Sequence, residues 1–214
     1  MKQLLIFFLG IGFLQAQIKE VKIGQQVWMA ENLDVDKFLN GDIIPQAQSN
    51  EEWENAGFRK QPAWCYVSYT ENNKEQQLTK YKKLYNSFAV NDPRGIVPNG
   101  WHISTTANWE DLNEFLKKNK LSLNALMSAT DWKHHSGSNT LGLAIQPGGW
   151  RDVGCGDIGT SVTFWCELEN NSNVNENKNT FTYSLVQYEN GSMALIKNSN
   201  SWIMGHYVRC VKNQ

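Results

Sequence analysis

The sequence predicts an α+β domain with few helices, short antiparallel strands and a loop-rich half. Two observations predict this class: one amphipathic helix in the middle of the chain, and several short strand-like segments between turn signals, most of them late. Nine Trp, seven Tyr and nine Phe accompany only 19% charged residues, which fits a turn-rich domain built around large rings. The chain has no long internal repeat and no Pro-rich linker, so residues 17–214 are expected to form a single domain.

The first elements of this domain are strands. Residues Ile18 to Met29 alternate around Gly24 and predict two short strands about a turn. Ala63 to Val67 predicts another strand.

The helix is predicted to begin after Thr105, whose hydroxyl can cap it. Four apolar residues then recur at the i, i+3 and i+4 spacing of one helical face, with acidic residues on the other face. The apolar residues are Trp109, Leu112, Phe115 and Leu116. A second, shorter helix is predicted around Ser122 to Ser128.

The last third of the chain is divided by Pro147-Gly148-Gly149 and later glycines, which indicates turns. Four strands are predicted between and after these turns. They are Val162 to Cys166, Thr180 to Val186, Ser192 to Ile196 and His206 to Val211.

The first 16 residues have the pattern of a secretory signal peptide. Lys2 precedes an apolar run from Leu4 to Leu14, and cleavage is expected after Ala16. No later apolar run is long enough to cross a bilayer, so the mature chain is expected to have no transmembrane segment. The expected location is secreted, either periplasmic or extracellular.

Four cysteines remain in the mature chain, and export makes disulfides the expected state. Of the three possible pairings, the spacing favours Cys155 with Cys166 across a hairpin and Cys65 with Cys210 as a long-range link. A metal site is the competing interpretation, but no CxxC occurs and no His is at ligand spacing from a Cys. No metal and no cofactor are therefore predicted.

Charge and motifs exclude several functions. Twenty Lys and Arg against 21 Asp and Glu make a nucleic-acid partner unexpected. The chain has no Gly-x-Ser-x-Gly, His-Glu-x-x-His or phosphate-binding loop, and no residue is predicted to be catalytic.

Tryptophans in polar, loop-like segments are the candidate ligand-binding residues. Exposed rings beside polar groups can stack on sugar faces or anchor a protein partner. The candidates are Trp150, Trp202 and Trp132, with Arg151 next to the first of them. The alternative is that most of these rings cap a loosely packed core.

Seven blocks, in order, resemble the Fibrobacter succinogenes major paralogous domain, a family of secreted and surface proteins of bacteria. The blocks are VKIGQQVWMAENLDV from Val21, PAWCY from Pro62, KLYNSFAVNDPRG from Lys83, PNGWHIS from Pro98, the helix from Trp109, QPGGWRD from Gln146, and YVRCV from Tyr207. The segment GWHISTTANWEDL is also similar to a stretch of formylglycine-generating-enzyme-like domains. The resemblance therefore implies a C-type-lectin-like fold.

Departures from the family pattern limit what can be transferred. Val97 stands where members usually carry a cysteine, so the resemblance gives Cys210 no customary disulfide partner. Asn108 replaces a Glu at the helix start, which predicts a weaker capping box. The cysteine pair of formylglycine-generating enzymes cannot be placed on this chain.

Three functions stay open at this point. The leading hypothesis is a secreted, non-catalytic binding module that recognises a glycan or a cell-surface protein. The alternatives are a structural protein of a surface assembly and a cryptic enzyme on the same scaffold.

Overall fold

A computed structural model describes residues 18–71, 74–167 and 181–213. The predicted signal peptide lies outside these ranges. The helices are α1 (Asn50–Phe58), α2 (Ser87–Val90) and α3 (Thr106–Lys118), and two 3₁₀ turns are η1 (Thr79–Tyr81) and η2 (Leu123–Ala125). Within the described ranges, no helix is long and apolar enough to cross a bilayer.

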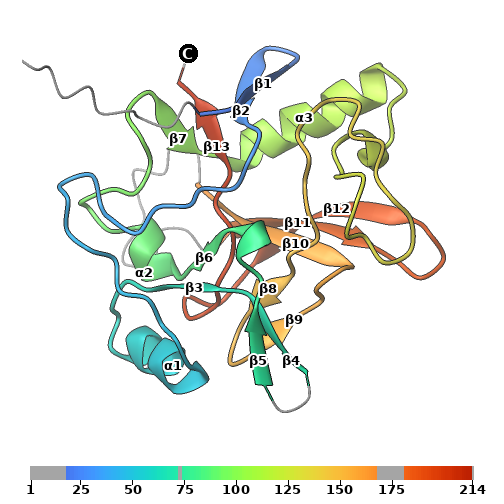
Figure 1. Ribbon diagram of the computed structural model, residues 1–214. Helices are drawn as coiled ribbons and strands as arrows, with labels where there is room; N and C mark the ends of the chain where they lie inside the picture. Colours follow the sequence, from blue (N-terminus) through green and yellow to red (C-terminus); the bar gives the residue numbers. More distant parts are fainter. Residues whose placement is uncertain (1–17, 72–73, 168–180, 214) are drawn as a thin grey trace, which may run out of the picture.

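A four-stranded sheet joins the two ends of the described chain. Its strands have the order β1-β2-β13-β7, and all the pairs are antiparallel. The strands are β1 (Glu20–Ile23), β2 (Gln26–Met29), β13 (Cys210–Lys212) and β7 (Trp101–Ile103). Figure 1 shows this sheet at the end of the molecule opposite to α1.

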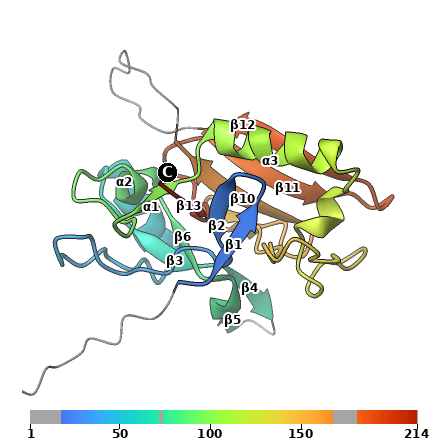
Figure 2. The same cartoon turned by 90° about the horizontal axis from the view of Figure 1, so that it is seen from above.

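A three-stranded antiparallel sheet forms the second layer with α3. Its order is β10-β11-β12, with β10 (Ser161–Cys166), β11 (Phe181–Gln187) and β12 (Met193–Ser199). Figure 2 shows α3 running across this sheet. Trp109 of α3 stacks on Phe164 of β10 and on Tyr183 of β11, with ring centroids 5.1 and 5.8 Å apart. Large rings therefore hold the helix to the sheet.

Three two-stranded ribbons complete the fold. They are β3 (Trp64–Tyr66) with β6 (Lys83–Tyr85), β4 (Ser68–Glu71) with β5 (Lys74–Gln77), and β8 (Trp150–Arg151) with β9 (Cys155–Gly156). The larger core cluster contains Trp28 of β2, Trp109 of α3 and Phe164 of β10, so side chains from both sheets and the helix contribute to it. A second cluster includes Trp64 and Trp165.

The predicted fold class is confirmed: the domain is a mixed α+β domain with short antiparallel strands. The predicted N-terminal hairpin about Gly24 and the predicted face of α3 are also present, and Trp109, Leu112 and Leu116 are buried. The predicted second helix is only the short turn η2.

The start of α3 is better capped than the sequence suggested. The Thr105 hydroxyl accepts a hydrogen bond from the backbone N–H of Asn108. The Asn108 amide oxygen in turn accepts one from the backbone N–H of Thr105, at 2.9 Å. The capping box is therefore complete, because an amide oxygen can replace the carboxylate of a Glu.

Both predicted disulfides are wrong, since the structure contains no disulfide among the four cysteines. Cys155 and Cys166 do not face each other across a hairpin: β9 pairs with β8, whereas β10 pairs with β11. Cys65 lies opposite Leu84 in the β3–β6 ribbon, whereas Cys210 belongs to the four-stranded sheet. Sequence spacing failed here because strand pairing, and not separation along the chain, decides which thiols meet.

The Cys155 thiol instead contacts the start of β4, where its sulfur accepts a hydrogen bond from the backbone N–H of Ser68 at 3.3 Å. Cys166 and Cys210 are fully buried, and burial raises the pKa of each thiol to about 12. Such thiols are poor nucleophiles at neutral pH.

Non-reducing peptide mapping of the native protein should therefore find neither a Cys155–Cys166 nor a Cys65–Cys210 cross-link. Alkylation without denaturant should leave Cys166 and Cys210 unmodified, and both should react once the chain is unfolded. Either cross-link in the peptide map would contradict the strand pairing described above.

His206 is a buried histidine with no charged partner among the residues that the structure describes. Its ring lies edge-on to Trp165, with ring centroids 4.5 Å apart. Nε2 is 3.2 Å from the Asn200 amide nitrogen, which can only donate, so Nε2 accepts and Nδ1 carries the proton. Nδ1 has no hydrogen-bond partner among the described residues. Burial lowers the pKa of His206 from 6.5 to about 3.

This histidine predicts a loss of stability in mild acid. As the pH falls below the unfolded-state pKa of 6.5, the unfolded chain gains a proton that the folded chain does not bind until near pH 3. This group alone should lower the free energy of unfolding by about 2 kcal/mol between about pH 7 and about pH 5. Urea unfolding of the wild type and of His206→Gln at both pH values checks this. An equal acid-induced loss in the variant would rule out His206 as the source.

Candidate functional site

Two of the four candidate ligand-binding residues are buried. The Trp132 ring is 7% exposed, and its Nε1–H donates to the Ile145 carbonyl at 3.1 Å. The Arg151 guanidinium lies 5.2 Å from the centre of the Trp53 ring and donates to the Asn50 amide oxygen at 2.7 Å. Both side chains thus make interactions inside the protein.

The other two candidates are partly exposed and lie on different segments. Trp150 is on β8, where its Nε1–H donates to the Asp157 carboxylate at 2.9 Å. Trp202 follows β12, and its ring meets the Phe88 ring edge-on at 5.4 Å. Each indole is thus fixed by its own neighbours, and their role in ligand binding stays a prediction.

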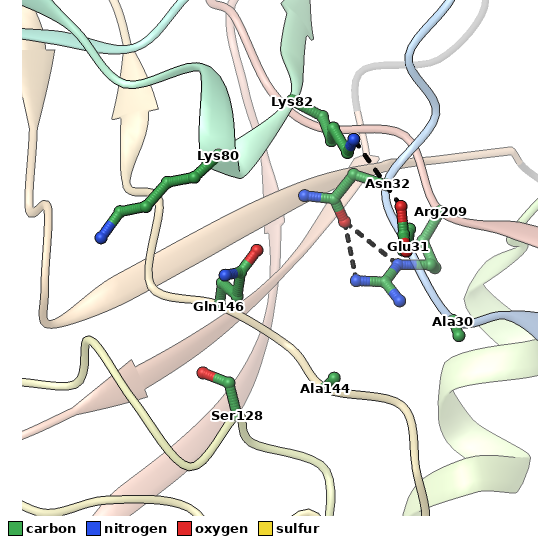
Figure 3. A pocket seen from close by; sticks show the side chains of 9 residues that line it. All are labelled: Ala30, Glu31, Asn32, Lys80, Lys82, Ser128, Ala144, Gln146 and Arg209. Atoms are coloured by element: carbon green, nitrogen blue, oxygen red, sulfur yellow. Dashed lines mark hydrogen bonds and ion pairs between the residues drawn. The ribbon is translucent and has the colours of Figure 1, made fainter. Parts of the chain in front are cut away.

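A polar pocket of about 330 Å³ lies elsewhere on the molecule. Five segments that are distant in sequence line it, and most of the lining side chains can form hydrogen bonds (Figure 3). The lining residues are Ala30, Glu31, Asn32, Lys80, Lys82, Ser128, Ala144, Gln146 and Arg209. We refer to this site as the Arg209 pocket.

Arg209 forms the base of the pocket and is only 2% exposed. Its Nε and Nη2 both donate to the Asn32 amide oxygen, at 3.1 and 2.7 Å. Its Nη1 donates to the backbone carbonyls of Met29 and Leu143, each at 3.0 Å. Burial lowers the pKa of Arg209 to about 10, so the guanidinium is still protonated at neutral pH.

The wall beside Arg209 comes from the segment after β2. The Asn32 amide donates to the Tyr81 carbonyl at 3.0 Å, which fixes its oxygen toward Arg209. Glu31 accepts a hydrogen bond from Lys19 at 2.8 Å, and this bond holds the pKa of the Glu31 carboxyl below its ordinary value. Glu31, the only carboxylate among the described residues of the lining, is therefore ionised at neutral pH.

Two lysines stand at the rim. Lys80 pairs with Asp131, which lies outside the pocket lining, at 2.5 Å. Lys82 makes two longer ion pairs, with Glu31 at 3.7 Å and with Asp34 at 3.6 Å. Exposed pairs of this kind contribute about 0 to 1 kcal/mol, so a ligand can compete with them.

Two non-glycine residues of the lining and one beside it have positive φ angles, as do four others elsewhere in the described chain. Lys82 has φ 70° and ψ −165°, a combination that side chains other than glycine avoid. Ala144 in the lining has φ 49°, and Asp131, the partner of Lys80, has φ 74°. Conformations of this kind typically cost about 1 to 3 kcal/mol for Lys82 and less for the left-handed residues, and they occur most often at functional sites.

This pocket was not predicted from the sequence. One signal was present: Arg209 is the one charged residue within the predicted strand His206 to Val211, whose neighbours are apolar. A charged side chain at such a position suggests a buried cation with specific partners. The partners themselves come from Asn32 and Leu143, and no local pattern identifies them.

Comparison with known proteins places the chain in a family. The family model described as the Fibrobacter succinogenes major domain matches residues 21–212, so the chain belongs to this family. This confirms the resemblance found in the sequence. No curated protein and no solved structure matches the chain, and the C-type-lectin-like topology stays an expectation.

Arg209 should be essential for stability. Arg209→Leu would leave the Asn32 amide oxygen and two backbone carbonyls without their donor, and we expect a loss of about 3 kcal/mol or more. Arg94→Leu is the matched control, because the Arg94 side chain is 36% exposed and pairs with carboxylates, and its loss should cost about 1 kcal/mol. Urea unfolding measures both. Equal losses for the two variants would contradict a structural role for the buried guanidinium.

Proposed function

We propose that this protein is an exported, non-catalytic binding module that recognises a glycan, with a cell-surface protein as the alternative class of partner. The observation that carries the proposal is the Arg209 pocket, a preformed polar hollow with a rigid base. Its volume lies at the lower end of the range of about 300 to 1,000 Å³ that is usual for small-molecule sites. This size suits one sugar residue of a longer chain.

The chemistry of the lining supports a sugar ligand. Gln146 lines the pocket, and its side chain makes no hydrogen bond with another described residue. Ser128 uses its hydroxyl proton to bond the Thr130 carbonyl, so its oxygen can accept a hydrogen bond. Lys82 can donate. Together they offer donors and acceptors to ring hydroxyls.

The lining also favours binding over hydrolysis. Glycosidases commonly use two carboxyl groups, one of which must stay protonated near neutral pH. Among the described residues that line the pocket, Glu31 is the single carboxylate, and its hydrogen bond to Lys19 favours the ionised form. This part of the lining thus provides neither the second carboxyl group nor the proton donor.

The expected signal peptide agrees with a ligand outside the cytoplasm. Family membership adds no reaction or substrate to this picture. Trp150 and Trp202 remain two alternative positions for glycan binding, since both rings are partly exposed.

A glycan array probed with three variants tests the proposal. We expect Gln146→Ala to weaken binding about tenfold, since it removes hydrogen bonds to the ligand, while the exposed Gln25→Ala in the β1–β2 turn has no effect. Trp150→Ala should also bind as the wild type does.

If Trp150→Ala alone weakens binding, the glycan site is at the loop aromatics and not at the Arg209 pocket. If the wild type binds no glycan, glycan recognition is wrong.

A further inference from the structure

The inference concerns the charge of the ligand and rests on the proposed function. Arg209 is a buried cation, and every hydrogen-bond acceptor recorded for its guanidinium is neutral: one side-chain amide and two backbone carbonyls. Buried charges in proteins are usually paired with an opposite charge, because a buried unpaired ion is costly. Glu31 acts on Arg209 only through its longer-range charge and is itself engaged by Lys19 and Lys82.

The guanidinium still has donor capacity toward the pocket. Of its five N–H groups, four are used by the recorded hydrogen bonds, and the remaining proton is on Nη2. Figure 3 shows Nη2 on the side of the guanidinium that faces Gln146 across the pocket. An anionic group placed there would supply the missing counter-charge.

The rim supplies a second positive donor. Lys82 holds its carboxylate partners at 3.6 and 3.7 Å, longer than a direct charge-assisted hydrogen bond. The lining as a whole has three cationic side chains and one carboxylate. The two carboxylates just outside it, Asp34 and Asp131, pair with Lys82 and Lys80.

The available donors suit a carboxylate. Arg209 Nη2 and Lys82 Nζ can each donate to one of its two oxygens, while Lys80 is engaged by Asp131 at 2.5 Å. Gln146 and Ser128 then remain for neutral hydroxyl groups, as in a sugar ring. A carboxylate and hydroxyls on one ring describe a hexuronate.

We propose that the Arg209 pocket binds an acidic sugar residue, a hexuronate of a polysaccharide, with its carboxylate on Arg209 Nη2 and Lys82 Nζ. The ring hydroxyls bind Gln146 and Ser128. The ligand carboxylate is the anion that the protein itself does not provide to Arg209.

The test is isothermal titration calorimetry with oligomers of galacturonate, glucuronate and mannuronate, with their methyl esters, and with a sulfated neutral oligosaccharide. The methyl esters keep every ring hydroxyl and remove only the charge. We expect at least one acid to bind, and its ester to bind about tenfold or more weakly.

Two variants connect this difference to the pocket. Lys82→Gly removes the ammonium group, so affinity for the acid should fall about tenfold. Glycine also adopts the φ of 70° at this position without strain, so the melting temperature should not fall. Lys60→Gly is the matched control, because Lys60 is an exposed lysine with φ 55° outside the pocket and should bind as the wild type does. Asn32→Asp gives Arg209 a carboxylate of its own and should also weaken binding of the acid relative to the wild type. If Asn32→Asp does not fold, the comparison of Lys82→Gly with Lys60→Gly decides the outcome.

The possible failures are distinguishable. Equal affinity for acid and ester, or preference for a neutral glycan, would overturn the acidic-sugar proposal and leave glycan binding intact. Stronger binding of the sulfated oligosaccharide would overturn the carboxylate assignment. No binding to any acid overturns the proposal, and a glycan array without any hit overturns glycan recognition as well.

Discussion

The buried guanidinium of Arg209 is the interaction on which the arrangement of the domain depends. It joins the residue before β13 to Met29 at the end of β2, to Asn32 and to the loop at Leu143. Its carbon Cζ also lies 5.6 Å from the centre of the Phe164 ring. Removing a guanidinium from water is costly unless its donors meet well-placed acceptors. Segments that are far apart in sequence must therefore meet at fixed positions. The Arg209 side chain thus forms the base of the pocket and also contacts both sheets, through Met29 of β2 and Phe164 of β10.

This arrangement places stability and binding in partial conflict. Neutral acceptors satisfy the hydrogen bonds of Arg209 but give its charge no directly bonded anion, which costs folding free energy. Lys82 and Ala144 add positive φ angles in the same lining. A protein selected for stability alone would place a carboxylate at Asn32 and glycine at the strained positions. The present lining keeps a positive donor available instead, as expected for a preformed anion site.

Local sequence patterns allowed much of the fold to be predicted, whereas contacts between distant segments could not be predicted. The helix after Thr105 and the hairpin about Gly24 depend on caps, turns and periodicity within a few residues. Helix α1 was missed although Ser49 and Glu52 form its capping signal, because Trp53 is its only large buried side chain. The disulfide pairing and the Arg209 pocket depend on which strands and loops meet, and no spacing in the sequence encodes that.

The most direct measurement is the ¹⁵N–¹H spectrum of the arginine side chains, titrated with an oligogalacturonate and with its methyl ester. If Arg209 holds the ligand carboxylate, its Nε and Nη resonances should shift with the acid and not with the ester. Arg151 is equally buried but lies outside the pocket, and its resonances should not move. An unchanged Arg209 signal at saturating acid, or an equal shift with the ester, would contradict the role assigned to the buried guanidinium.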